Sequence, residues 1–182
     1  MNFIETPFEG LVVIEPKIWK DDRGYFYESY NQERFEAAGI PANFVQDNQS
    51  FSQKGALRGL HAQAPPHAQG KLVRVIQGSV KDVVVDIRKN SATYGKHFSI
   101  TLSAENFKML WIPPGFIHGF VTLEDNTIFS YKVTSLYNKN SELGGLWNDP
   151  DLGIDWGISS NEVILSDKDK ILPLLKDLQS PF

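Results

Sequence analysis

The sequence predicts an all-β domain, arranged as a sandwich or a jelly-roll barrel. Short runs rich in Val, Ile, Phe and Tyr recur along the 182 residues, and several alternate apolar with polar side chains. Turn-forming residues separate these runs about every ten residues. The aromatic share of 12% is high, which suits a β-rich core. No change of composition marks a linker, so we expect residues 1–182 to form a single domain.

The expected strands follow one another with turn residues between them. The strands are predicted at residues 11–15, 25–30, 44–50, 57–61, 71–76, 80–87, 97–102, 108–112 and 128–134. The turns carry Asp-Arg-Gly at 22–24, Pro-Pro at 65–66, Gln-Gly at 77–78, Pro-Pro-Gly at 113–115 and Glu-Asp-Asn at 124–126. Only two short helices are expected. One covers residues 31–38 with Asn31 as its cap, and the other starts at Ser166, which an acid follows three residues later.

Charge and cysteine content narrow the possible functions. A formal net charge of −4 is atypical of a nucleic-acid binder, which usually carries a basic patch. With no cysteine, the chain has no disulfide, thiolate metal site or cysteine nucleophile. No segment has the pattern of a signal peptide or a membrane span. We therefore expect a cytoplasmic protein that binds neither nucleic acid nor membranes.

The densest group of polar residues lies between positions 44 and 76. In the predicted strand 57–61, alternation with period two places Arg58 on the opposite face from Gly59 and His61, provided that the strand is regular. Gly59 and Ala62 are small, so His61 can face a cavity. A packed or a surface histidine is the alternative, and the residue types alone leave both open.

Three more side chains have the chemistry of a catalytic group. Lys71 shares a strand face with Val73 and Val75, which is unusual for an exposed lysine, although a frayed strand end would also explain it. His118 follows a turn and lies among aromatic residues and glycines. Tyr131 is either a core tyrosine or a proton donor.

The histidines lack the spacing of a metal site. A barrel-type site needs a His-x-His pair with further His or carboxylate ligands, and here the pair position reads His61-Ala62-Gln63. His67 and His97 have no partner at a suitable spacing. We therefore expect no bound metal, which leaves the histidines available for acid–base chemistry.

Ten short motifs follow one another along the chain and carry a family resemblance. They are Asp22-Arg23-Gly24-x-Phe26-x-Glu28, Gln46-Asp47-Asn48-x-Ser50, Leu57-Arg58-Gly59-Leu60-His61-x-Gln63, Gln69-Gly70-Lys71-Leu72-Val73-Arg74, Asp82-Val83-x-x-Asp86-x-Arg88, Tyr94-Gly95, Trp111-Ile112-Pro113-x-Gly115-Phe116-x-His118-Gly119-Phe120, Tyr131-Lys132, Trp147-Asn148-Asp149-Pro150 and Ser166-x-Lys168-Asp169. Together they resemble the dTDP-4-dehydrorhamnose 3,5-epimerases of the cupin superfamily. The resemblance covers nearly the whole chain, from Phe8 to Asp169.

The resemblance implies a cupin-type double-stranded β-helix jelly roll that acts as a homodimer, without metal or organic cofactor. It implies that C3 and C5 of dTDP-4-dehydro-6-deoxy-D-glucose are inverted, giving dTDP-4-dehydro-L-rhamnose for dTDP-L-rhamnose biosynthesis. By match to the family motifs, His61 is the base with Asp169 as its partner, Tyr131 is the acid, and Lys71 lies beside the carbonyl oxygen. The implied substrate-binding residues are Arg23, Phe26, Glu28, Gln46, Asn48, Arg58, Lys71, His118, Tyr137, Glu142 and Lys168, with Tyr137 stacking on the thymine.

One departure and three alternatives remain at this point. The family usually has an aromatic residue where this chain has Ala62, so we expect a reshaped pocket wall or core there. Residues 64–68 form a variable loop, and His67 carries no implied role. The alternatives are an epimerase of only C3 or only C5 (or a ketoisomerase), a non-catalytic sugar-nucleotide-binding module, and a metal-dependent cupin enzyme.

Overall fold

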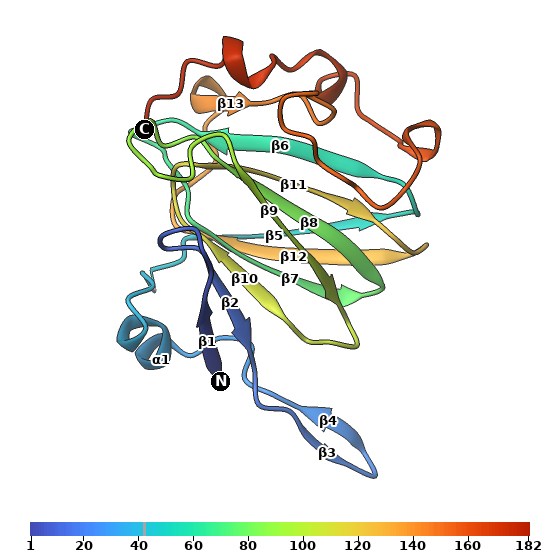
Figure 1. Ribbon diagram of the computed structural model, residues 1–182. Helices are drawn as coiled ribbons and strands as arrows, with labels where there is room; N and C mark the ends of the chain where they lie inside the picture. Colours follow the sequence, from blue (N-terminus) through green and yellow to red (C-terminus); the bar gives the residue numbers. More distant parts are fainter. Residues whose placement is uncertain (42) are drawn as a thin grey trace.

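Two antiparallel β-sheets face each other in the computed structural model, which describes residues 1–41 and 43–182 (Figure 1). The six-stranded sheet has the order β1 (Asn2–Glu5), β2 (Val12–Glu15), β10 (Met109–Ile112), β7 (Lys71–Gln77), β12 (Thr127–Val133) and β5 (Gln46–Ser52). The five-stranded sheet has the order β13 (Glu142–Gly144), β6 (Leu57–Gln63), β11 (Phe116–Thr122), β8 (Ser79–Asp86) and β9 (His97–Ser103). Most neighbouring strands are not consecutive in sequence, so the chain winds between the sheets as a jelly roll. The predicted all-β fold is confirmed.

The space between the sheets is filled by the inward side chains of both. On β7, Val73 and Val75 are almost completely buried and pack with Phe129 of β12. On β8, Val80 and Val84 alternate inward in the same way. Burial of such side chains contributes roughly 1.5–3 kcal/mol each, so this layer holds the sheets together. Phe129 of this layer also lines the cavity described below.

Strand β6 departs from the regular alternation that the sequence predicts. His118 of β11 pairs with His61, but Phe120 pairs with Arg58, so β6 holds one extra residue between the two pairs. Arg58 and His61 therefore both line the interior, while Leu60 packs on the opposite face. The prediction that Arg58 and His61 lie on opposite faces is wrong, because a β-bulge adds one residue and reverses the alternation.

A short helix covers the outer face of the six-stranded sheet. The helix is α1 (Gln32–Ala37), and the side chain of Asn31 caps it by accepting a hydrogen bond from Arg34 N. Phe35 is fully buried against Ile14 and Trp111 of the sheet. The predicted helix at residues 31–38, with Asn31 as its cap, is confirmed.

The C-terminal segment covers the outer face of the five-stranded sheet. It contains three short 3₁₀ helices, η2 (Ser160–Glu162), η3 (Asp169–Ile171) and η4 (Leu175–Asp177). A fourth, η1 (Lys139–Ser141), comes just before β13. Trp147 and Trp156 pack there against the side chains of β8. The expected second helix is the single turn η3, in which Asp169 N donates to Ser166 Oγ at 3.2 Å. This turn lies against β6, as Figure 1 shows.

A two-stranded hairpin, β3 (Trp19–Asp21) and β4 (Gly24–Phe26), projects away from the barrel (Figure 1). The strand predicted at 25–30 is thus shorter than expected. Strands β1, β3, β11 and β13 were not predicted. No helix in the described part of the chain is long and apolar enough to cross a membrane.

Candidate active site

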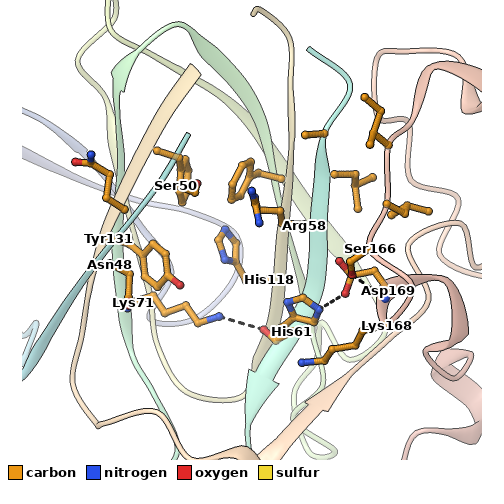
Figure 2. Close-up of a pocket in the computed structure, with 17 residues that line it drawn as sticks. Asn48, Ser50, Arg58, His61, Lys71, His118, Tyr131, Ser166, Lys168 and Asp169 are labelled. Carbon is orange, nitrogen blue, oxygen red and sulfur yellow. Dashed lines mark hydrogen bonds and ion pairs between the residues drawn. The ribbon is translucent and has the colours of Figure 1, made fainter. Parts of the chain in front are cut away.

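A cavity of about 560 Å³ opens between the two sheets, and the chemically reactive side chains meet in it. Figure 2 shows His61 and Asp169 on one side of the cavity, Tyr131 and Lys71 on the other, and His118 between them. A second hollow of about 320 Å³ shares His61, Lys71 and Tyr131 with the first. The predicted catalytic residues, which are distant in sequence, therefore surround one space.

His61 and Asp169 form a tight pair at the wall of the cavity. His61 Nε2 lies 2.6 Å from Asp169 Oδ1, and the Asp169 side chain is only 5% exposed. Burial opposes ionisation of Asp169, but hydrogen bonds from His61 and Ser166 outweigh it and hold the pKa of the carboxyl below its usual range. The ionised carboxylate accepts a hydrogen bond from Nε2–H of His61. Nδ1 is then left unprotonated, as a general base requires.

Lys71 supplies a positive charge inside the cavity. Its Nζ donates to the backbone carbonyl of His61 at 3.2 Å. Burial lowers the pKa of the ammonium to about 8, and the negative charge of Asp82 offsets part of this effect. At neutral pH the group is mostly charged. A cation in this sheltered position can stabilise negative charge that develops on a bound molecule.

Tyr131 faces the base from the other sheet. It belongs to β12, next to the β7 strand of Lys71, whereas His61 belongs to β6. Burial raises the pKa of the Tyr131 phenol, and Arg58 offsets only part of that rise. The hydroxyl therefore stays protonated at neutral pH and is able to donate.

A second histidine–carboxylate pair lies deeper in the cavity. His118 Nε2 is 2.8 Å from Asp82 Oδ2, and both side chains are buried. Burial lowers the pKa of His118 although Asp82 works against this, so the ring is neutral at neutral pH. Asp82 Oδ1 has no hydrogen-bond partner in the described structure. Sequence reasoning gave Asp82 no role, yet its place between the inward-facing Val80 and Val84 was a signal that could have found it.

The second hollow is lined by residues that we expect to contact the nucleotide. Tyr137 and Glu142 lie on its wall with Gln46 and Asn48. The Tyr137 hydroxyl is hydrogen-bonded to Glu142, which also accepts from Lys168 Nζ at 2.6 Å. The Gln46 amide is engaged within the protein, because it donates to Asn48 Oδ1 at 2.9 Å and accepts from Tyr137 N at 3.1 Å. The structure thus brings these five residues together at one rim.

Of the other predicted binding residues, Arg58 lies in the large cavity, whereas Arg23, Phe26 and Glu28 lie on or next to the projecting hairpin. Arg58 reaches the large cavity from β6 and donates to Ser52 Oγ at 3.2 Å. Arg23 and Phe26 lie on the projecting hairpin, where the Phe26 side chain is 67% exposed. Glu28 follows the hairpin and forms an ion pair with Arg34 at 3.1 Å. None of Arg23, Phe26 and Glu28 lines either hollow of this chain.

Ala62 lies mainly behind the wall of the site. It is 8% exposed, and it packs in the apolar cluster on the outer face of β6 while pairing with Leu143 of β13. The residue also borders the second hollow. Within residues 1–41 and 43–182, no group of three or more His, Cys, Asp and Glu side chains is placed to hold a metal ion.

Comparisons with known proteins agree on one family. The family model described as dTDP-4-dehydrorhamnose 3,5-epimerase matches residues 5–177 of the chain. The chain belongs to this epimerase family. Its sequence is 50% identical over 179 residues to the dTDP-4-dehydrorhamnose 3,5-epimerase of Escherichia coli K12, covering 98% of this chain and 96% of that one. The family assignment from the ten motifs is confirmed.

Solved structures of other members support the same conclusion. The epimerase from Elizabethkingia anophelis superimposes with a TM-score of 0.95 at 49% identity, covering 99% of both chains. The Legionella pneumophila epimerase, solved in complex with dTDP-4-keto-L-rhamnose, gives a TM-score of 0.93 at 48% identity and covers 98% of this chain and 94% of its own. The cupin-type jelly roll and the assignment as an isomerase are therefore both established for this epimerase.

Proposed function

We propose that this epimerase inverts C3 and C5 of dTDP-4-dehydro-6-deoxy-D-glucose to give dTDP-4-dehydro-L-rhamnose, a step of dTDP-L-rhamnose biosynthesis. One observation carries the proposal. A histidine–aspartate pair and a protonated tyrosine enter the same cavity from opposite sheets, beside a buried ammonium group. The names of the relatives and the ligand of the Legionella structure supply the substrate class.

The first half of the reaction is proton removal next to the ketone. His61 Nδ1 takes the proton from C3 or C5, and the C–H electron pair forms the carbon–carbon double bond of an enolate. The carbonyl electron pair moves to the oxygen at C4, where the Lys71 ammonium stabilises it. Asp169 accepts a hydrogen bond from Nε2–H throughout, so that the imidazolium is stabilised as it forms. Loss of one such electrostatic contact typically costs on the order of 10²–10³ in rate.

Inversion requires that the new proton arrives on the opposite face of the ring. A single base cannot serve both faces of a sugar that stays in place, so a second group is needed. Tyr131 donates its proton to the carbon while the enolate collapses back to the ketone. Solvent then reprotonates the phenolate and takes the proton from His61. His118, held neutral, accepts a hydrogen bond from a sugar hydroxyl through Nδ1.

The remaining predicted residues are assigned to the nucleotide. Arg58 and Lys168 bind diphosphate oxygens, for which cations are suited. Tyr137 stacks on the thymine, and Gln46 and Asn48 contact the nucleoside. The support is their position on the walls of the two adjoining hollows.

Deuterium incorporation tests the reaction. The chelator-treated enzyme is incubated with dTDP-4-dehydro-6-deoxy-D-glucose in D₂O and followed by proton NMR. Exchange at both C3 and C5, with a product that an NADPH-dependent reductase accepts, is the expected result. Label at only one carbon would instead support a single-site epimerase. Binding without label would point to a sugar-nucleotide-binding module, and activity lost on chelation would point to a metal-dependent enzyme.

The hairpin gives a reason to propose a homodimer. Trp19, Tyr25 and Phe26 expose 43%, 58% and 67% of their surface on β3 and β4. Apolar surface of this size on a projecting arm favours burial against a partner. We infer that the arm reaches a second copy of the chain, so that Arg23, Phe26 and Glu28 serve the neighbouring cavity. A cytoplasmic location stays a prediction.

Hybrid dimers test the exchange of arms. Chains carrying Arg23→Ala and chains carrying His61→Ala are co-expressed with different tags, and the mixed dimer is isolated. If the arm crosses, one of the two sites combines an intact arm with an intact base, so about half of the wild-type activity returns. If the arm serves its own chain, neither site is intact and the hybrid stays as inactive as its parents.

A further inference from the structure

Between β12 and η1, residues 135–138 are hydrogen-bonded to the side chains of three glutamines. Gln69 Nε2 donates to Ser135 O at 2.7 Å, and Gln63 Nε2 donates to Leu136 O at 3.2 Å. Tyr137 N donates to Gln46 Oε1 at 3.1 Å, and Asn138 N donates to Gln63 Oε1 at 2.7 Å. Each of four consecutive residues thus has a backbone group bonded to a glutamine. We call Gln46, Gln63 and Gln69 the glutamine clamp.

Gln63 is the central member of the clamp. It stands on β6 two residues after His61, and its side chain is only 4% exposed. Besides its bonds to Leu136 and Asn138, its Nε2 donates to His67 O at 2.6 Å. Both ends of the amide are therefore satisfied in a sheltered place, where hydrogen bonds are strong and an unpaired group is costly. One side chain ties the loop at 64–68 to the loop that carries Tyr137.

His67 reinforces the same connection from the loop side. Its Nδ1 lies 2.9 Å from Ser141 Oγ, and its Nε2 lies 3.3 Å from Asn138 Nδ2. Asn138 in turn caps η1, because its side chain accepts from Asn140 N at 2.9 Å. The backbone on both sides of Tyr137 is therefore anchored.

The Tyr137 ring itself has little support from packing. The residue is 56% exposed, and its hydroxyl is bonded to Glu142. The position of the ring at the second hollow therefore depends on the backbone at residues 136–138 as well as on the bond to Glu142. A stacking surface contributes most when it is held in place before the ligand arrives, since ordering it on binding costs free energy.

We propose that Gln63 and Gln69 are positioning residues for nucleotide recognition, which act through Tyr137 by fixing its backbone. The inference rests on the proposed stacking of Tyr137 on the base. It assigns Gln63 and Gln69 to affinity rather than to proton transfer, because His61, Lys71 and Tyr131 keep their places on strands when the loop is loosened. Gln63 has the larger effect, since it makes three of the bonds and Gln69 makes one.

The test replaces each amide by an apolar side chain of similar length. Gln63→Met and Gln69→Met are compared with Gln53→Met, a control at an exposed glutamine whose side chain donates to Asn126 Oδ1 at 3.4 Å. The dissociation constant of dTDP is measured by calorimetry, and kcat and KM are measured with the 4-keto sugar nucleotide. We expect the dissociation constant of dTDP and the KM to rise about 5- to 20-fold for Gln63→Met and about 2- to 5-fold for Gln69→Met. We expect kcat to change by less than about threefold and the control to match wild type.

A double-mutant cycle with Tyr137→Ala separates this proposal from the assigned role of Tyr137. If the clamp acts through the ring, Gln63→Met has little further effect on dTDP binding once the ring is gone. An equal loss in both backgrounds overturns the proposal, as does a Gln63→Met variant that binds dTDP normally. If Tyr137→Ala itself leaves dTDP binding unchanged, the stacking role is what fails. Should Gln63→Met not fold, Gln69→Met carries the same cycle.

Discussion

The pH dependence of activity above neutrality should report the protonation of Lys71. The proposed mechanism needs the charged ammonium, whose pKa burial lowers to about 8 while Asp82 raises it in part. About nine-tenths of the free enzyme is then active at pH 7 and about one-tenth at pH 9, so kcat/KM should fall roughly tenfold over this interval. An ordinary lysine, with a pKa near 10.4, would give almost no loss over the same range.

Tyr131 and His118, two other titratable groups of the cavity, do not account for a loss of activity between pH 7 and pH 9. Burial raises the pKa of Tyr131, so the phenol stays protonated through this range. The pKa of His118 is lowered by burial, so this ring has already lost its charge at lower pH. We therefore expect Lys71 to be the group that titrates near pH 8.

Steady-state kinetics from about pH 6.5 to 9.5 measures the fall of kcat/KM with rising pH. Substitutions at Lys71 show whether this residue causes the fall. Lys71→Arg keeps a charge that does not titrate here, so whatever activity remains should show no fall near pH 8. Lys71→Met should lose on the order of 10²–10³ in kcat. A wild-type profile that stays flat to pH 9.5, or a fall that persists in Lys71→Arg, would refute the reasoning.

Three further substitutions give distinct results. Asp169→Asn should lower kcat on the order of 10³–10⁴-fold with dTDP binding retained, because the amide donates to Nε2 and turns the His61 proton toward the substrate; calorimetry and NMR check both halves. Tyr131→Phe should impair product formation more than deuterium wash-in at the carbon that His61 attacks, and equal losses would contradict its role as the separate acid. Asp86→Asn should cost about 2–3 kcal/mol of unfolding free energy at pH 7. Burial opposes ionisation of Asp86, but hydrogen bonds from Arg88 and its neighbours outweigh it and hold the pKa of the carboxyl at about 2, against about 3.9 in an unfolded chain. The lower native pKa makes this stability present above pH 4 and lost as the pH falls toward 2, so denaturation curves of the two proteins should converge in acid.

Most strands were predictable because their two faces differ. On β12, for example, the inward Phe129 and Tyr131 alternate with Ser130 and Lys132 of the other face. Strand β11 (Phe116–Thr122) gave no such signal, because all seven of its residues are buried and both of its faces are covered. A fully buried strand has no period of two, so alternation cannot find it.

The bulge in β6 could not be derived from alternation either. Gly59 has a φ of +140°, and a Cβ at this position would lie 2.5 Å from Gly119 Cα on β11. The glycine signalled a close approach of two strands, but the sequence does not say that the approach adds a residue to the register. Only the pairing shows that Arg58 and His61 face the same cavity.

Some functional groups stand on strands and others on connecting segments, and this explains what could be foreseen. His61, Lys71 and Tyr131 stand on strands whose register fixes their separation, as proton transfer at fixed geometry demands. Tyr137 and Lys168 stand on connecting segments, where their placement depends on hydrogen bonds from distant parts of the chain. The family motifs identified the strand-borne residues and the loop residues, but they did not show which side chains hold the loop of Tyr137 in place. The hydrogen bonds from the glutamine clamp to that loop involve none of the side chains of His61, Lys71 and Tyr131. We therefore expect changes in the clamp to alter nucleotide affinity while the acid–base geometry stays constant.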